Sequence, residues 1–172
     1  MPKELRKLMK PEYTFLPSFV SSARDTLETM ASTSCFHQAP LARDNSKSWG
    51  DISGIIPIES ETMKGVMVLS FEKDCALSLA SRVLGEEFST ISDEVVDVVD
   101  ELTNIISGGF KTDLNQLGHK FELALPRVVV GKGVDIPDLK NDFLTLPFST
   151  DTGSFVIEAQ FVMTKDQGGD NE

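Results

Sequence analysis

Two periodicities of apolar residues run along this chain, and together they predict its secondary structure. Recurrence every three or four positions predicts three helices, over residues 17–31, 74–84 and 93–117. Runs rich in branched and aromatic residues predict five strands, over residues 52–59, 65–71, 121–130, 142–148 and 154–164. The predicted order is therefore helix, two strands, two helices and three strands.

Short connections between these segments favour antiparallel pairing. The sequence STDTG at residues 149–153 predicts a tight hairpin between the last two strands. We expect an α/β protein of the α+β kind: a single domain with a mostly antiparallel sheet and helices packed on it. A weak internal helix-strand-strand repeat places Pro57 and Pro126 alike, although accidental patterning would give the same similarity.

The composition narrows the classes of function. The chain has 172 residues, of which 40% are apolar and 25% are charged, as expected for one globular domain. A formal net charge of −11 argues against nucleic-acid binding, because phosphate contacts need clustered Lys and Arg. The N-terminus lacks the apolar stretch of a signal peptide, and no segment approaches the ~20 apolar residues of a membrane span. We therefore expect a cytoplasmic protein without a membrane partner.

The sequence predicts no metal or cofactor site. Cys35 and Cys75 lie in no C-x-x-C pair, and His37 and His119 complete no zinc-ligand spacing. We expect both cysteines to be buried or incidental thiols. The chain also contains no P-loop and no dinucleotide-binding glycine motif, so we expect it to use no cofactor of its own.

One predicted helix carries a pattern that suggests chemistry. Asp97, Glu101 and Asn104 are spaced by four and three residues, so on a helix they form a single polar stripe. The opposite side is apolar and consists of Val95, Val98, Val99, Leu102, Ile105 and Ile106. The stripe should therefore face water or a partner. Its carboxylate and carboxamide can grip a cation or orient a water molecule, although an acidic outer face is also typical of a merely solvated helix.

Together with Pro126, the stripe forms the longer pattern D-x-x-x-E-x-x-N, then 21 residues, then P. In this form it resembles the signature of the CheC/CheX/FliY family, phosphatases that act on the bacterial chemotaxis response regulator CheY. A single copy of the motif in a chain of this size is most similar to CheX. The first predicted helix offers Ser21, Asp25 and Glu28 but no Asn three residues after the Glu, so we expect one active site per chain.

The resemblance implies a role for each motif residue. Asn104 would orient the water that attacks the aspartyl phosphate of a CheY-like receiver domain, and Glu101 would pair with a receiver lysine. Asp97 and Pro126 would support the helix surface and the neighbouring strand. The receiver would supply Mg²⁺, and the phosphatase would be a homodimer. The implied boundaries are a basic lead-in over residues 1–14, a CheX-like phosphatase domain over residues 15–165 and an acidic tail over residues 166–172.

Two questions stay open at the level of sequence. Gly108 and Gly109 follow Asn104 by about one turn, and a glycine inside a helix costs about 1 kcal/mol relative to alanine. The pair fits either close packing against a neighbouring element or the approach of a partner's loop. The chain itself fits a phosphatase, a non-catalytic adaptor or phospho-state sensor of the same fold in chemotaxis or flagellar control, or an unrelated α/β domain with an accidental match.

Overall fold

The computed structural model describes residue 2 and residues 10–164. The predicted acidic tail and most of the basic lead-in lie outside this part of the chain. The described residues form four helices: α2 Pro11–Thr14, α3 Leu16–Ala31, α4 Lys73–Leu84 and α5 Asp93–Gln116. They also form eight strands: β1 Phe36–His37, β2 Leu41–Arg43, β3 Ile52–Glu59, β4 Met63–Phe71, β5 Glu122–Leu123, β6 Arg127–Val130, β7 Phe143–Thr150 and β8 Gly153–Met163.

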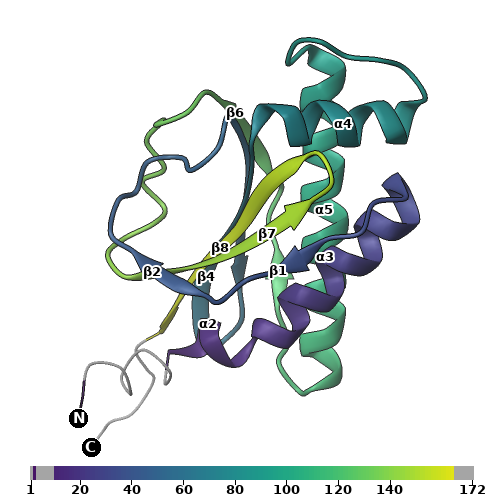
Figure 1. Ribbon diagram of the computed structural model, residues 1–172. Helices are drawn as coiled ribbons and strands as arrows, with labels where there is room; N and C mark the ends of the chain where they lie inside the picture. The colour runs from purple at the N-terminus through teal and green to yellow at the C-terminus, as the bar shows by residue number, and fades with distance from the viewer. Residues whose placement is uncertain (1, 3–9, 165–172) are drawn as a thin grey trace, which may run out of the picture.

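All eight strands belong to one sheet, in the order β1-β7-β8-β4-β3-β5, with β2 also on β7 and β6 also on β3. Every pairing between these strands is antiparallel. Figure 1 shows α3, α4 and α5 on one face of the sheet, and two long loops on the opposite face. The expected α+β class, a single domain with helices packed on an antiparallel sheet, is thus confirmed.

The predicted strand over residues 121–130 is wrong in one respect, because it is broken into β5 and β6. Both pieces pair with β3, but in registers that differ by one residue. Ile58 lies opposite Leu123, whereas Ile55 lies opposite Arg127. Two residues of β3 therefore face the three residues 124–126, which is the arrangement of a β-bulge.

The bulge lies where both strands contain a proline. Pro57 in β3 and Pro126 between β5 and β6 have no N–H to donate, so each is tolerated where the ladder is interrupted. One hydrogen bond crosses the interruption, from the Ala124 N–H to the Pro57 carbonyl at 3.0 Å. Beyond the bulge, Val128 packs against the same core as Leu123, although their odd separation would place them on opposite faces of an unbroken strand.

Three short elements were not predicted from the sequence. The segment over residues 32–51, expected to be a polar connection, contributes β1 and β2, which both pair with β7. Helix α2 precedes α3 and is only four residues long. These pieces are too short to show a period of their own, and their backbone partners lie far away in sequence.

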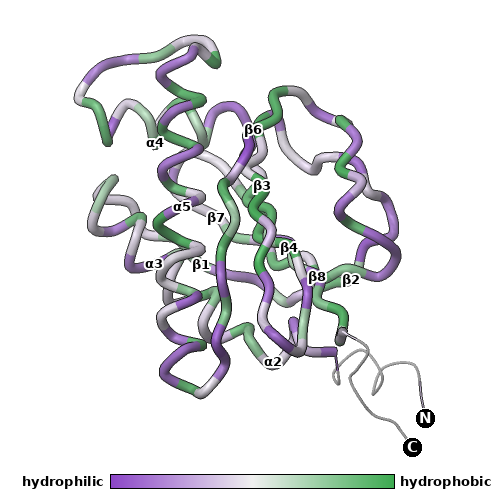
Figure 2. Tube along the Cα trace, turned by 180° about the vertical axis from the view of Figure 1, so that it is seen from behind, coloured by the Kyte–Doolittle hydropathy of each residue, from purple (hydrophilic) through white to green (hydrophobic). Residues whose placement is uncertain are grey.

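The main core lies between the helices and the sheet, and aromatic rings fill much of it. Phe19 of α3 stacks on Phe110 of α5 with ring centroids 4.3 Å apart, which locks the two helices together. On the sheet side, Phe148 and Phe155 stack at 4.7 Å. Figure 2 shows the apolar colour along the central strands and alternation of polar and apolar positions on α5. The position of α5 is therefore fixed by a packed apolar face.

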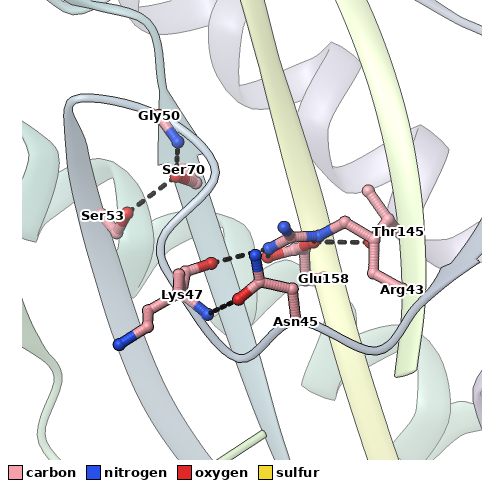
Figure 3. Close-up of polar contacts among 8 residues, drawn as sticks. All are labelled: Arg43, Asn45, Lys47, Gly50, Ser53, Ser70, Thr145 and Glu158. Carbon is pink, nitrogen blue, oxygen red and sulfur yellow. Dashed lines mark hydrogen bonds and ion pairs between the residues drawn. The ribbon is translucent and has the colours of Figure 1, made fainter. Parts of the chain in front are cut away.

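The opposite face of the sheet is covered by the loops over residues 44–51 and 131–142 and contains an ion pair between a half-buried arginine and a buried carboxylate. Glu158 of β8 is fully buried, and its Oε2 accepts a hydrogen bond from Arg43 Nε at 2.8 Å and one from Thr145 Oγ1 at 2.5 Å (Figure 3). Arg43 also donates to the Lys47 carbonyl at 2.8 Å. Because these groups satisfy the buried carboxylate, they attach the first loop to the sheet.

Candidate active site

Helix α5 carries the predicted motif, and its start is fixed locally. Ser92 is the N-cap, and its side chain accepts a hydrogen bond from the Val95 N–H at 3.5 Å. Asp93 and Glu94 occupy the first turn, where the positive end of the helix dipole favours carboxylates. The helix then runs 24 residues to Gln116, one residue short of its predicted end.

The structure places Asp97, Glu101 and Asn104 on one exposed face of α5. Within the described residues, none of these three side chains makes a hydrogen bond or an ion pair with another residue. On a helix, residues three or four apart have Cβ atoms about 5–6 Å from each other. A carboxylate and a carboxamide thus project together from a rigid helix, and both are free to bind a partner.

The other side of α5 is buried as expected. Val95, Val98, Val99, Leu102 and Ile106 are buried, and Ile105 is half-buried. Two hydrogen bonds hold α5 against α3: Ser22 Oγ donates to the Ile106 carbonyl at 2.6 Å, and Ser21 Oγ donates to Asp113 Oδ2 at 3.2 Å. These contacts set the rotation of α5, and therefore the direction in which the stripe points.

The two glycines that follow Asn104 have different surroundings. A Cβ atom at Gly109 would lie 2.5 Å from Ser22 Oγ, so this glycine permits close packing against α3. A Cβ atom at Gly108 would meet nothing within 4 Å. Gly108 lies four residues after Asn104, on the same side of the helix. The surface one turn beyond Asn104 is therefore open.

Pro126 lies at the end of the bulge beside α5. Both β5 and β6 contact α5 along one edge of the sheet. The structure places Pro126 in the interruption between β5 and β6, and not within a continuous strand as expected. Its side chain carries no group that can donate, accept or transfer a proton. Its contribution is to the shape of this edge.

Helix α3 contains the polar residues of the first half of the internal repeat. Ser21, Asp25 and Glu28 are exposed and line a cavity of about 520 Å³ along α3. The position three residues after Glu28 is Ala31, which is buried. This helix therefore presents no carboxamide beside its carboxylate, in contrast to α5.

Among the described residues, no group of three or more His, Cys, Asp or Glu side chains is placed to hold a metal ion. Cys35 and Cys75 are both buried free thiols, as expected. Burial raises the pKa of Cys35 to about 11 and that of Cys75 to about 12, so both remain protonated and poorly nucleophilic at neutral pH.

In the described part of the chain, no helix combines the length and apolar composition that crossing a membrane requires.

A groove beside the stripe was not predicted from the sequence. It has a volume of about 280 Å³ and is formed where the last turns of α3 and α4 meet the first half of α5. Glu101 lies on its rim, and Leu84, at the end of α4, is 44% exposed at the same place. No periodicity signals such a groove, because its walls come from three helices that are distant in sequence.

Comparison with known proteins agrees with this architecture. The family model described as chemotaxis phosphatase CheX matches residues 52–149, which contain the whole motif. The chemotaxis protein CheX from Vibrio vulnificus is 34% identical, with a TM-score of 0.79 over 87% of this chain and 99% of that one. A CheC-like superfamily protein from Shewanella sp. PV-4 is also 34% identical, with a TM-score of 0.79 over 86% of this chain and 97% of that one.

A more distant structure shares the fold. The CheX–CheY–BeF3–Mg²⁺ complex from Borrelia burgdorferi contains a chain that is 24% identical, with a TM-score of 0.68 over 88% of this chain and 98% of that one. A search of curated proteins finds no match.

The fold and the α5 stripe define a class of α+β domains with an acidic helix face exposed above one sheet. Within that class, the chain belongs to the chemotaxis phosphatase CheX family.

Proposed function

We propose that this protein removes the phosphoryl group from the aspartyl phosphate of a CheY-like response regulator. The observation that carries the proposal is the joint exposure of Glu101 and Asn104 on α5, with both side chains free of partners within the described part of the chain. Membership of the CheX family and the complex of a CheX with a CheY from Borrelia burgdorferi support the choice of partner.

In this mechanism α5 docks over the phosphorylation pocket of the receiver and Asn104 enters it. The Asn104 side-chain carbonyl accepts a hydrogen bond from a water molecule and aligns its oxygen with the phosphorus and the leaving aspartate oxygen. The water oxygen bonds to phosphorus as the bond to aspartate breaks, which yields inorganic phosphate and a free carboxylate. A carboxamide suits this position because a carboxylate would be repelled by the phosphoryl oxygens.

Glu101 has a different role from Asn104. It forms a charge-assisted hydrogen bond with a lysine of the receiver, and so fixes how far along the pocket the helix lies. The receiver would supply the Mg²⁺ that neutralises charge on the phosphoryl group. Asp97 and Pro126 support the docking surface and take no part in bond making.

The test is phosphate release from a panel of phosphorylated CheY-type receivers with and without the protein. We expect acceleration above the receiver's own hydrolysis for at least one member. Tight binding to phosphorylated receivers without any acceleration would instead identify the non-catalytic adaptor or phospho-state sensor.

We also propose that two copies pair through edge strands. Strands β5 and β6 form one edge of the sheet, and there Leu125 and Val130 are 88% and 52% exposed. Strands β1 and β2 lie at the opposite edge, on β7. Open strand edges with apolar side chains readily pair with another chain. Light scattering of the purified protein should give twice the mass of one chain, and a monomeric mass at micromolar concentration would contradict the pairing.

A further inference from the structure

The groove between α3, α4 and α5 is apolar inside and acidic at its rim. Its walls are formed by Met30, Val83, Leu84, Val98 and Leu102. Its rim contains three carboxylates, Glu94, Asp97 and Glu101. Two of these carboxylates belong to the exposed stripe of α5, so the groove is continuous with the candidate active site. We call it the α3–α4–α5 groove.

The shape of the α3–α4–α5 groove is held by contacts of its own. Arg82, near the end of α4, donates to Thr33 Oγ1, just after α3, at 2.7 Å. It also forms an ion pair with Asp151 at 2.8 Å. Val98 and Leu102 are almost fully buried and cannot turn away. Because the walls are already positioned, a side chain that enters the groove meets little cost of ordering them.

The size of the groove indicates the kind of occupant. Pockets for small molecules commonly span about 300–1,000 Å³, and the groove, at about 280 Å³, is smaller than that range. Its size and apolar lining are compatible with a large apolar side chain, the type of anchor that dominates binding at protein interfaces.

The charge of the rim distinguishes among possible protein partners. A second copy of this chain would bring the same carboxylates, and a net charge of −11, against the rim. Like charges brought face to face disfavour that contact. A surface with basic side chains around an apolar one is complementary to the rim. Glu101 lies on this rim, so a partner that places a lysine against Glu101 also covers the mouth of the groove.

We propose that the α3–α4–α5 groove takes one large apolar side chain of the receiver domain, flanked on the receiver by basic side chains. This rests on the proposed function for the identity of the partner. It assigns Leu84 and Met30 to receiver binding, and it gives Asp97 a place on the acidic rim. The groove holds the receiver beside the stripe while Asn104 reaches the phosphoryl group.

Two matched leucines test the proposal. Leu84 ends α4, and Leu117 caps the far end of α5 with 70% of its surface exposed. Leu84→Ser and Leu117→Ser remove the same apolar side chain, so they change overall hydrophobicity equally. The ligand is the CheY-type receiver of the panel that the wild-type protein binds most tightly, loaded with beryllium trifluoride and Mg²⁺ as a stable mimic of the phosphoryl group. We expect Leu84→Ser to raise the Kd about tenfold, and Leu117→Ser to leave it within about twofold of the wild-type value.

A second variant and a kinetic readout separate a binding role from a folding defect. Met30→Ala shortens a different wall of the groove and should also weaken binding. Both groove variants should raise KM while kcat at saturating receiver stays near the wild-type value, because the lost contact is made equally in the ground and transition states. A loss of kcat with unchanged KM would overturn the assignment.

The outcomes for the two proposals are distinguishable. Equal Kd values for Leu84→Ser and Leu117→Ser, with full wild-type turnover, would overturn the groove contact alone. Receiver binding that depends on Leu84 without any phosphate release would support the groove contact and overturn the proposed function. No binding of any loaded receiver by the wild-type protein would overturn both.

Discussion

Gly109 of α5 lies so close to Ser22 of α3 that a Cβ atom at position 109 would stand 2.5 Å from the Ser22 hydroxyl oxygen. The hydroxyl is held in place by its 2.6 Å hydrogen bond to the Ile106 carbonyl. The neighbouring Gly108 has open space where its side chain would be. Packing against α3 therefore explains the second glycine of the pair and does not explain the first.

Alanine at position 108 should raise the stability of the protein and lower its phosphatase activity. Gly108→Ala adds a good helix former at a half-buried helix position with open space for the new methyl group, and should raise the free energy of unfolding by up to about 1 kcal/mol. The new methyl group lies one turn from Asn104, so we expect slower phosphate release from the phosphorylated receiver. Urea unfolding and a phosphate-release assay measure the two effects.

The contrast with position 109 provides the control. Gly109→Ala should lower the free energy of unfolding by about 1–3 kcal/mol, as overpacking does. The double variant Ser22→Ala with Gly109→Ala should recover part of this loss. Unchanged phosphate release by the stabilised Gly108→Ala protein would mean that no partner approaches the helix there.

Substitutions of Asn104 and Glu101 should have different effects on receiver binding and turnover. Asn104→Ala should reduce phosphate release by at least about 100-fold while receiver binding persists, because water positioning is needed only in the transition state. Glu101→Ala should weaken both binding and turnover, because it removes an ion pair with the receiver. Steady-state kinetics and binding to the beryllium-trifluoride form separate these effects. Asn141→Ala, an exposed asparagine far from α5 in the sequence, serves as the matched control.

Mg²⁺ should be required by the receiver and not by this protein. The described part of the chain contains no cluster of ligands for a tight divalent site, and Glu101 with Asn104 supplies too few. After treatment with a chelator and dialysis, we expect unchanged thermal unfolding of the protein alone and full activity once the receiver is given Mg²⁺. A stoichiometric metal that the isolated protein retains and needs for activity would contradict this expectation.

Glu12 should make stability depend on pH. It is 1% exposed, and desolvation raises the pKa of its carboxyl above the ordinary value of 4.5. The folded state therefore favours the protonated form more than the unfolded state does. The resulting stabilisation is fully present below the ordinary pKa and is lost as pH rises through the raised one.

The variant Glu12→Gln tests this linkage. Glutamine keeps a carbonyl for the Phe161 N–H, which now donates to Glu12 at 3.4 Å, and has no charge to desolvate. We expect the variant to be more stable than the wild-type protein at pH 7, by a margin that shrinks toward pH 4. Chemical unfolding across that range measures the margin. Glu61→Gln, at an exposed turn, should show no such trend.

A structural feature could be predicted from the sequence when neighbouring residues determine it, and could not when residues distant along the chain create it. The bounds of β3 and the course of α5 were predicted closely, because long amphipathic or apolar runs carry their own period. The exposed stripe followed from the same period. The strands β1 and β2 and the groove at Leu84 did not, because each is created by contacts between segments that are distant along the chain.

The bulge at residues 124–126 also indicates where this chain can change in length. Removing one of these residues would leave two residues between β5 and β6 opposite two residues of β3. Leu123 and Val128 would then keep their present partners in β3. Removing a residue within β6 would instead turn the side chains beyond it to the other face. We therefore expect a one-residue deletion to be tolerated at the bulge and opposed within β6. A deletion at residue 124 or 125 would shorten the spacing of 21 residues between Asn104 and Pro126 without turning any core side chain of β5 or β6.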